Sequence, residues 1–402
     1  MRAPDRHRQA PVLVLVMVLA LGPALVGLLG AGGCRPDPVA GPPGVGGDGS
    51  AGGPAGGEVG GESSGEGSQG DGSDGQGQTG GDGEGDGGGE PPPGRAACPL
   101  CGAWVPEAHL LHRPLAVVVD NAAPSRPQSG LGDACLVYEV LVEGRLTRFV
   151  AFFLHTESAA IGPVRSLRPY MLDLVMPVGA VVAHVGGSPQ ALEEVARLGS
   201  SARSIDAMKD AGAFWHMSGR RPPFNTFTGT SLLRAASQAR GYEGFSLTAM
   251  TPTAFRFAAS AEDAVLPAGQ SVMRFTVSYG APGGYAVTYD YDPESGRWMR
   301  YVRGAAHIDA ATERQLGATT VIVHRATCRV IPGDPEGRLE MTLTGSGRAK
   351  VFVGGRVLDA VWSKAGRDGA AVYTDLQGDP LVLPPGPVWV LVVPPESALS
   401  LQ

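Results

Sequence analysis

The stretch ACLVYEVLVEGRLTRFVAFFLH, residues 134–155, decides the fold because it contains two apolar runs separated by a short polar turn. Both runs, 134–144 and 147–155, are rich in Val, Leu and Phe, which favour β-strands. The EGR segment between them is short enough to join two antiparallel strands as a hairpin. In a regular strand alternate residues share a face, so Glu139 and Glu143 are expected to project to the same side.

The sequence around this hairpin predicts further strands and two helices. RPLAVVVDN (113–121) and GAVVAHVGG (179–187) have the composition of buried strands. Helices are expected over 169–176 and 188–199, and Ser188 is suited to the N-cap of the second one.

The pattern changes at about residue 262. From there to residue 398, short alternating or fully apolar runs are separated by Gly, Pro and Asp turns, which is typical of antiparallel β-structure. We therefore predict a mixed α/β fold, with an N-terminal α/β domain over 96–250 and a C-terminal β-rich domain over 262–398. The first domain is expected to be a layered α/β sandwich over 96–245. Periodicity leaves open whether the second part is separate or completes the first sheet.

The first 34 residues have the features of an export signal. A basic start, MRAPDRHRQA, precedes a long apolar run that contains the helix-weakening Pro23. The run ends in AGGC, which resembles a bacterial lipobox, although Ala31 stands where Leu is usual. We predict a signal peptide over 1–34, with Cys34 carrying lipid (palmitate) and anchoring the protein to the outer side of the cell membrane. An uncleaved membrane anchor is the alternative.

Residues 35–95 are predicted to be a disordered, acidic, Gly-rich linker. Gly, Asp, Glu, Ser and Pro dominate this segment, which cannot bury enough surface to offset its ordering entropy. It carries a net charge of −9 and residues 1–34 carry +2, so within the total of −7 the remaining 96–402 is neutral. A neutral folded region offers no broad basic field, which argues against a nucleic-acid partner.

Polar side chains gather where the predicted strands end, a place where loops of α/β sheets commonly bind ligands. IGPVRSLRPY (161–170) supplies two arginines, which can grip carboxylate or phosphate bidentately, and HVGGSP supplies a helix N-terminus, which favours an anion. We predict a cleft that binds an anionic envelope ligand, a cell-wall polymer or a phospholipid. Its candidate residues are Asp120, Asn121, Arg126, Gln128, Glu139, Glu143, Arg148, Arg165, Arg168, His184, Gly187, Ser188 and Asn225.

The same residues allow a second interpretation, in which the arginines are structural. Arg165 and Arg168 would then hold Glu139, Glu143 or Asp173 in internal salt bridges and lock the hairpin. The sequence leaves both interpretations open.

CPLCGAWVPEAHLLH contains two cysteines and two histidines that could hold zinc in a small knuckle, although the loop between the two pairs is shorter than the common finger spacing. The candidate ligands are Cys98, Cys101, His109 and His112. A Cys98–Cys101 disulfide is an alternative in an exported protein, and free thiols are another. No other cofactor is indicated.

Five motifs in order resemble the YerB-like lipoprotein family: RPLAVVVDNAAPSRPQSGL, VYEVLVEGRLTRFVAFF, IGPVRSLRPY, HVGGSPQAL and RRPPFNTFTGT. C-terminal stretches such as GRLEMTLTGSGRAKVFVGGRVLDAVW are similar as well, so the resemblance covers about residues 98–396. It implies a lipid-anchored envelope protein of mixed α/β layered fold, and it implies no established activity.

The chain departs from the family pattern at two places. Phe224 stands where relatives typically have His, so a mechanism that needs that His fails here. CPLCG (98–102) stands where relatives often have Asn-Pro-Leu-Thr-Gly, so the main function of the family does not require these cysteines.

The leading functional hypothesis is therefore a binding module of the cell envelope. One alternative is an envelope hydrolase or transferase with Asp120 or Glu139 as base and arginines that stabilise negative charge. Another is a structural scaffold for envelope partners. The one G-x-S-x-G match, GESSG (61–65), lies in the predicted disordered linker and not between a strand and a helix, and the sequence contains no Walker or H-E-x-x-H motif that would favour catalysis.

Overall fold

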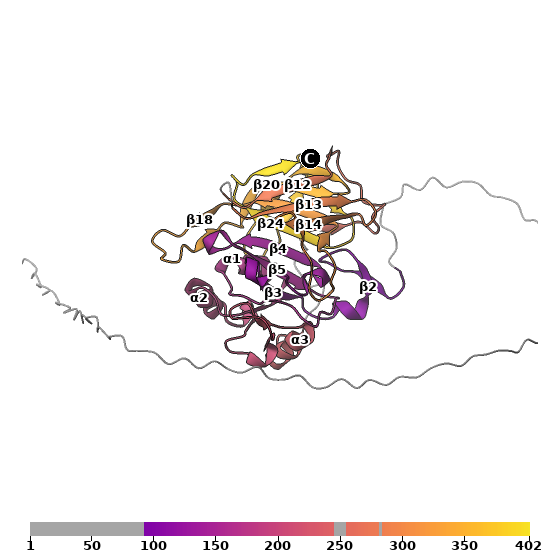
Figure 1. Cartoon of the computed structure of the whole chain (residues 1–402). Helices are drawn as coiled ribbons and strands as arrows, with labels where there is room; N and C mark the ends of the chain where they lie inside the picture. The colour runs from indigo at the N-terminus through magenta and orange to yellow at the C-terminus, as the bar shows by residue number, and fades with distance from the viewer. Residues whose placement is uncertain (1–91, 245–254, 281–283) are drawn as a thin grey trace, which may run out of the picture. The chain divides into compact units, whose positions relative to one another are not determined.

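The computed structural model describes residues 92–244, 255–280 and 284–402. These residues form mostly β-strands with few helices (Figure 1). The predicted signal peptide, the lipid-attachment residue Cys34 and the predicted linker up to residue 91 lie outside the described residues. No helix within the described ranges combines the length and apolarity needed to cross a membrane.

An eleven-stranded sheet runs through both the N-terminal and the C-terminal parts of the described chain. Its order is β11-β21-β20-β17-β24-β4-β5-β3-β6-β7, with β22 paired to β21. The N-terminal part supplies β3 (Leu115–Asp120), β4 (Leu136–Leu141), β5 (Thr147–Phe153), β6 (Val181–His184) and β7 (Ser204–Asp206). The C-terminal part supplies β11 (Gln270–Ser271), β17 (Thr320–Arg325), β20 (Gly345–Val353), β21 (Arg356–Lys364), β22 (Val372–Thr374) and β24 (Val388–Val393).

The two parts meet where β24 pairs with β4 in parallel. On the other side β24 pairs in parallel with β17, so it lies between strands from opposite ends of the chain. The C-terminal part therefore completes the sheet that the N-terminal part begins, an arrangement that periodicity alone had left open.

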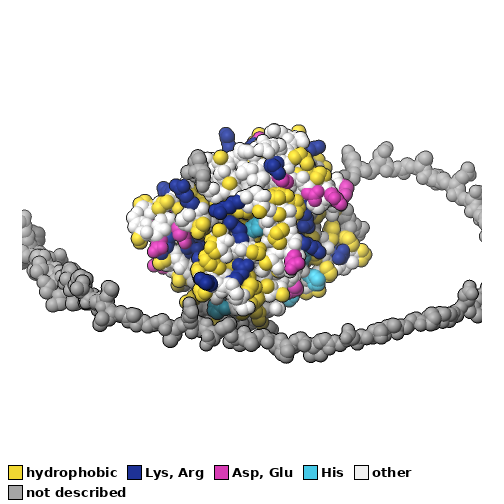
Figure 2. Space-filling model, in the orientation of Figure 1, with side chains coloured by type: hydrophobic (Ala, Val, Ile, Leu, Met, Phe, Trp, Pro, Cys, Tyr) yellow, Lys and Arg dark blue, Asp and Glu magenta, His cyan; other side chains and the backbone are white. Residues whose placement is uncertain are grey.

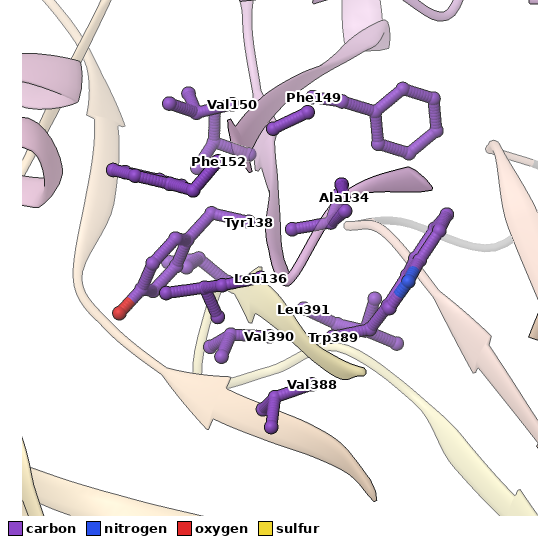
Figure 3. Close-up of a cluster of buried hydrophobic side chains, with 14 of the residues drawn as sticks. Ala134, Leu136, Tyr138, Phe149, Val150, Phe152, Val388, Trp389, Val390 and Leu391 are labelled. Carbon is purple, nitrogen blue, oxygen red and sulfur yellow. The ribbon is translucent and has the colours of Figure 1, made fainter. Parts of the chain in front are cut away.

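The predicted hairpin over 134–155 is present. β4 and β5 pair antiparallel, with Glu139 opposite Phe149, and every residue of both strands is buried. Figure 3 shows Phe149 of β5 near Trp389 of β24, whereas Phe152 lies on the other side with Tyr138 and Leu136 of β4. Such complete burial accounts for the nearly continuous apolar sequence of these strands.

Three α-helices occur in the described ranges: α1 (Pro169–Val175), α2 (Pro189–Leu198) and α3 (Thr230–Ala239). They lie near the N-terminal strands in Figure 1. The first two match the predicted helices, and the Ser188 hydroxyl caps α2 by accepting the Ala191 amide at 3.2 Å. Strands predominate all the same, so the coarse architecture is a mostly β fold around one mixed sheet.

A second, six-stranded sheet comes from the C-terminal part alone and has the order β15-β14-β13-β12-β25, with β16 paired to β14. The Phe275 ring of this sheet stacks on Phe352 of β20 at 3.6 Å, and Trp298 meets the same ring edge-on at 5.6 Å. Its strands are β12 (Arg274–Ser278), β13 (Ala286–Asp292), β14 (Arg297–Val302), β15 (Ala305–Ala306), β16 (Gly317–Ala318) and β25 (Leu399–Leu401).

The remaining strands form two-stranded pairs. These are β1 (Arg95–Ala97) with β2 (Trp104–Pro106), β8 (Trp215–His216) with β9 (Thr226–Phe227), β10 (Arg256–Phe257) with β23 (Val382–Leu383), and β18 (Cys328–Val330) with β19 (Leu339–Met341).

Candidate functional site

A buried ion pair joins the central hairpin to the six-stranded sheet. Glu139 of β4 and Arg300 of β14 approach to 2.8 Å, and both side chains are 0% exposed. Glu139 also accepts hydrogen bonds from Asn121 (3.0 Å) and Thr147 (2.8 Å), which satisfy its second oxygen. Arg300 also lies against the ring of Trp389, 4.9 Å from its centroid. The carboxylate is therefore fully partnered, as a buried charge must be.

The network continues from Arg300 to Gln128 through His307. The guanidinium can only donate, so the Nδ1 atom of His307, 3.1 Å away, must accept, and the ring proton lies on Nε2. Nε2 then donates to Gln128 Oε1 at 2.7 Å. Burial and the neighbouring Arg300 hold the pKa of His307 well below its usual value, which keeps the ring neutral.

Three of the predicted site residues, Asn121, Arg126 and Gln128, close this network on the N-terminal side. The Arg126 guanidinium donates to the Asn121 carbonyl at 2.6 Å and lies 5.4 Å from the ring centroid of Tyr285. The Gln128 amide donates to the backbone carbonyl of Asp120 at 2.8 Å. Together with Glu139, these residues form one continuous hydrogen-bonded group that spans both parts of the chain.

Arg165 belongs to a separate contact. Its guanidinium lies 2.8 Å from Asp120 and 5.7 Å from the ring centroid of Phe224. Phe224 thus gives Arg165 an aromatic surface at the position where the family resemblance led us to expect His. Asn225 follows in the same β8–β9 segment, where its carbonyl accepts the Met217 amide at 2.8 Å.

Arg168 and Arg148 both face Glu143 at the end of the hairpin. Arg168 binds the carboxylate through Nε at 2.9 Å and through a second, shorter contact from Nη2, and Arg148 lies 3.6 Å away. Although burial opposes ionisation, Arg168 lowers the pKa of Glu143. Burial and the charge of Arg168 lower the pKa of Arg148 to about 10. The structure thus pairs both arginines with carboxylates of the protein itself. Arg168 binds Glu143, as the structural interpretation expected, whereas Arg165 faces Asp120, which that interpretation did not include.

The HVGGSP segment is also internally satisfied. The Ser188 amide donates to the Leu167 carbonyl at 3.2 Å, and Gly187 pairs with Leu167 in a β-bridge. His184 is buried between the Gly186 carbonyl and the Ser204 hydroxyl, each at 2.7 Å. The Ser188 amide is used and Pro189 has no amide proton to offer, so of the 187–189 amides at most that of Gly187 could meet an anion.

The predicted zinc knuckle does not assemble as the sequence spacing suggested. Cys98 and Cys101 are buried, whereas His109 and His112 are exposed. Cys135 and His155 lie beside the two cysteines instead.

A solvent-facing hollow of about 440 Å³ lies on the outer side of the buried network. Arg126, Arg145 and Arg303 line it, with Asn121, Thr147 and Tyr285. We call it the arginine hollow. No Asp or Glu is among its described lining residues, and no ion pair to a carboxylate is found for these three arginines in the described ranges.

Two of these arginines have an unusual backbone. Arg145 and Arg303 adopt left-handed conformations, with φ of 58° and 54°. This region is unfavourable for residues other than glycine, and such strain clusters at functional sites. In Figure 2 basic and acidic side chains are interspersed on the visible face, so the arginine hollow stands out by its lack of carboxylates and not by a general basic surface.

Family models match both parts of the described chain. The model described as "Protein of unknown function (DUF3048) N-terminal domain" matches residues 100–243, and the corresponding C-terminal model matches residues 275–390. The chain belongs to the DUF3048 family.

Two comparisons with Bacillus subtilis support the assignment of this DUF3048 chain. It is 30% identical to "Putative lipoprotein YerB" of strain 168 over 309 residues, which cover 76% of this chain and 88% of that protein. It is also similar to the crystal structure of the YerB protein, with a TM-score of 0.65 and 27% identity over 76% of this chain and 99% of the other. The resemblance to YerB-like lipoproteins is confirmed.

Arg300, Arg145 and Arg303 of this DUF3048 chain were not among the candidate site residues that the sequence indicated. Arg300 alternates with Trp298 along β14, and both are buried. That alternation was the available signal, because residues two apart on a strand share a face. Arg145 and Arg303 stand in turns, where no periodicity marks them.

Removing the charge of Glu139 should destabilise the fold strongly. Glu139→Gln leaves Arg300 buried without a counter-charge, so we expect a loss of about 3–5 kcal/mol in unfolding free energy, measured by urea denaturation. Glu143→Gln is the matched control and should cost less, because Glu143 is 24% exposed. The double variant Glu139→Leu/Arg300→Met should be less destabilised than Glu139→Gln. A loss below about 1 kcal/mol for Glu139→Gln would contradict this account.

His307 should make stability depend on pH. Because its pKa is lowered in the folded state, the unfolded chain binds a proton that the folded chain does not, and stability falls as pH drops through about 6.5. His307→Asn should therefore lose less stability than the wild type between about pH 7.5 and 5.5. The exposed His112→Ala should keep the wild-type slope, and equal slopes for His307→Asn and the wild type would refute the assignment.

Proposed function

We propose that this chain is a membrane-anchored extracytoplasmic lipoprotein that binds an anionic envelope ligand in the arginine hollow. The observation that carries the proposal is the convergence of three arginines without carboxylate partners on one solvent-facing hollow. The lipid anchor is supported by the AGGC sequence ending in Cys34 and by the description of the Bacillus subtilis relative as a lipoprotein.

The charge arrangement favours this site over the cleft expected from the sequence. Arg165 is ion-paired with Asp120, and Arg168 is hydrogen-bonded to Glu143. A ligand there would have to displace a carboxylate, whereas the arginines of the hollow have no carboxylate partner among the described residues, and Arg126 is held only by the neutral Asn121 and the ring of Tyr285. Burial lowers the pKa of Arg126, which reflects a cation that has been partly removed from water and would gain from an anionic partner.

The floor of the arginine hollow adds polarity and a flat surface. Tyr285 presents its ring to Arg126, and Asn121 and Thr147 belong to the buried network beneath. Arginine binds phosphate and carboxylate oxygens in a forked geometry, which suits the phosphates of a wall polymer or of a phospholipid headgroup.

Another groove, on the C-terminal part, is less suited to an anion. Arg325, Lys350 and Asp359 line it, and Lys350 is paired with Asp359 at 2.8 Å. Arg325 donates to the Ser397 carbonyl at 3.0 Å. This groove therefore contains a carboxylate, Asp359, that would repel an anion, whereas no Asp or Glu is among the described lining residues of the arginine hollow.

The catalytic alternative gains nothing from the geometry. Asp120 and Glu139, the two carboxylates considered as a base, are paired with Arg165 and Arg300. Both carboxylates are already engaged by arginines of the protein, so the binding function is the one the site supports best.

Binding should depend on the arginines of the hollow. The probes are a poly(glycerol phosphate) wall polymer and vesicles containing phosphatidylglycerol, each presented to the detergent-purified full chain. Arg126→Gln, Arg145→Gln and Arg303→Gln should each weaken binding about tenfold, since each removes a charge-assisted contact. Affinity should fall as salt rises.

Arg256→Gln is the control for this measurement, because Arg256 is exposed and lies outside the hollow. Arg165→Ala/Arg168→Ala should lower stability more than affinity. If the three hollow variants bind both probes as well as the wild type does, the binding proposal fails.

The anchor has its own test. Cys34→Ser should remove the site of lipid attachment, so the protein should fail to incorporate labelled palmitate. It should also move from the membrane fraction to the soluble one, because the lipid that anchors it would be missing. Cys328→Ser is the control and should stay in the membrane. Unchanged palmitate incorporation in Cys34→Ser would contradict the anchor.

A further inference from the structure

Three cysteines and one histidine meet near the start of the folded region. One ligand atom from each of Cys98, Cys101, Cys135 and His155 lies within 4.8 Å of all the others. The Cys101 sulfur and His155 Nε2 are 3.3 Å apart. The three cysteines are buried and unbonded to one another, and His155 is half-buried.

The topology explains how residues far apart in sequence converge. Cys98 and Cys101 stand in the tight turn between β1 and β2, where the Gly102 amide donates to the Cys98 carbonyl at 2.7 Å. Cys135 immediately precedes β4 and His155 follows β5, so both lie at the open end of the central hairpin. The Cys135 amide donates to the Phe152 carbonyl at 2.8 Å, which fixes that end.

Gly102 shows that this turn is specifically shaped. Its φ is +71°, and a Cβ atom there would lie 2.5 Å from the Phe257 ring. The turn is therefore pressed against a neighbouring segment in a conformation that glycine allows. The two-residue spacing of the cysteines within it places both sulfurs on one side.

We propose that Cys98, Cys101, Cys135 and His155 bind one zinc ion as a structural site. Three thiolates and one imidazole form a common tetrahedral zinc set, and four protein ligands leave no position for water or substrate. Zinc–sulfur bonds of about 2.3 Å place tetrahedral ligand atoms about 3.8 Å apart, within the separations of this cluster. The ion replaces the protons of the three thiols, which pass to solvent.

The proposed zinc site would link the start of the folded region to the central hairpin. Cys98 and Cys101 lie directly after the predicted linker, and their partners lie on the most buried hairpin of the sheet. A bound zinc ion would hold the turn of Cys98 and Cys101 against the open end of the β4–β5 hairpin. This role is independent of ligand binding in the arginine hollow.

The test is the metal content of the detergent-purified full chain, prepared without reducing agent and measured by plasma mass spectrometry. We expect one zinc per chain, and loss of that zinc in Cys135→Ser and in His155→Ala. Two controls should retain it: Cys328→Ser, which removes another free thiol, and His109→Ala/His112→Ala, which removes the histidines nearest in sequence to the cysteine pair.

A second measurement does not depend on the folding of variants. After chelation, one equivalent of Co²⁺ added to the wild type should give thiolate-to-metal charge-transfer absorption, and the chelated protein should have a lower Tm than the zinc-loaded one. The proposal is overturned if the wild type holds no zinc, if Co²⁺ gives no thiolate band, or if the purified protein contains a Cys98–Cys101 disulfide.

Discussion

The buried ion pair between Glu139 and Arg300 is the constraint on which the rest of the structure depends. Taking two charges out of water is expensive, and the cost is met only when both are fully hydrogen-bonded. Asn121 and Thr147 complete the carboxylate, while His307, Tyr285 and the face of Trp389 surround the guanidinium. Each part supplies hydrogen bonds to its own member of the pair, but the counter-charge comes from the other part, so the N-terminal hairpin and the C-terminal sheet need each other.

This dependence shapes the surface above it. Arg126, which closes the network, reaches outward into the hollow with Arg145 and Arg303, while Arg165, Arg168 and Arg148 are directed at carboxylates of the protein. The arginines of this region therefore differ in whether a carboxylate of the protein pairs with them. Arg165, Arg168 and Arg148 face carboxylates of the protein, whereas no carboxylate pairs with the three arginines of the hollow in the described ranges. The proposed function rests on that division of roles.

The sequence predicted the elements better than the contacts between them. Apolar runs identified β3, β4, β5 and the Ser188-capped helix because burial and capping act locally. The partner of Glu139 was not predictable, since Glu139 and Arg300 come from opposite parts of the chain that meet through the pairing of β24 with β4. The cysteine pair was matched to the nearest histidines in sequence, although the hairpin ends bring Cys135 and His155 closer. In each case the deciding contact is long-range and follows from the sheet order.

The two family-matched parts are expected to unfold as one cooperative unit because β24 pairs with β4. Native-state hydrogen exchange of the full chain tests it most directly, because amides of one unit exchange through the same opening. The account predicts that the slowest amides of β4 (Leu136–Leu141) and of β17 (Thr320–Arg325) and β24 (Val388–Val393) exchange with the same free energy. A clearly lower free energy for β17 and β24 than for β4 would show that the C-terminal part opens alone and would contradict the account.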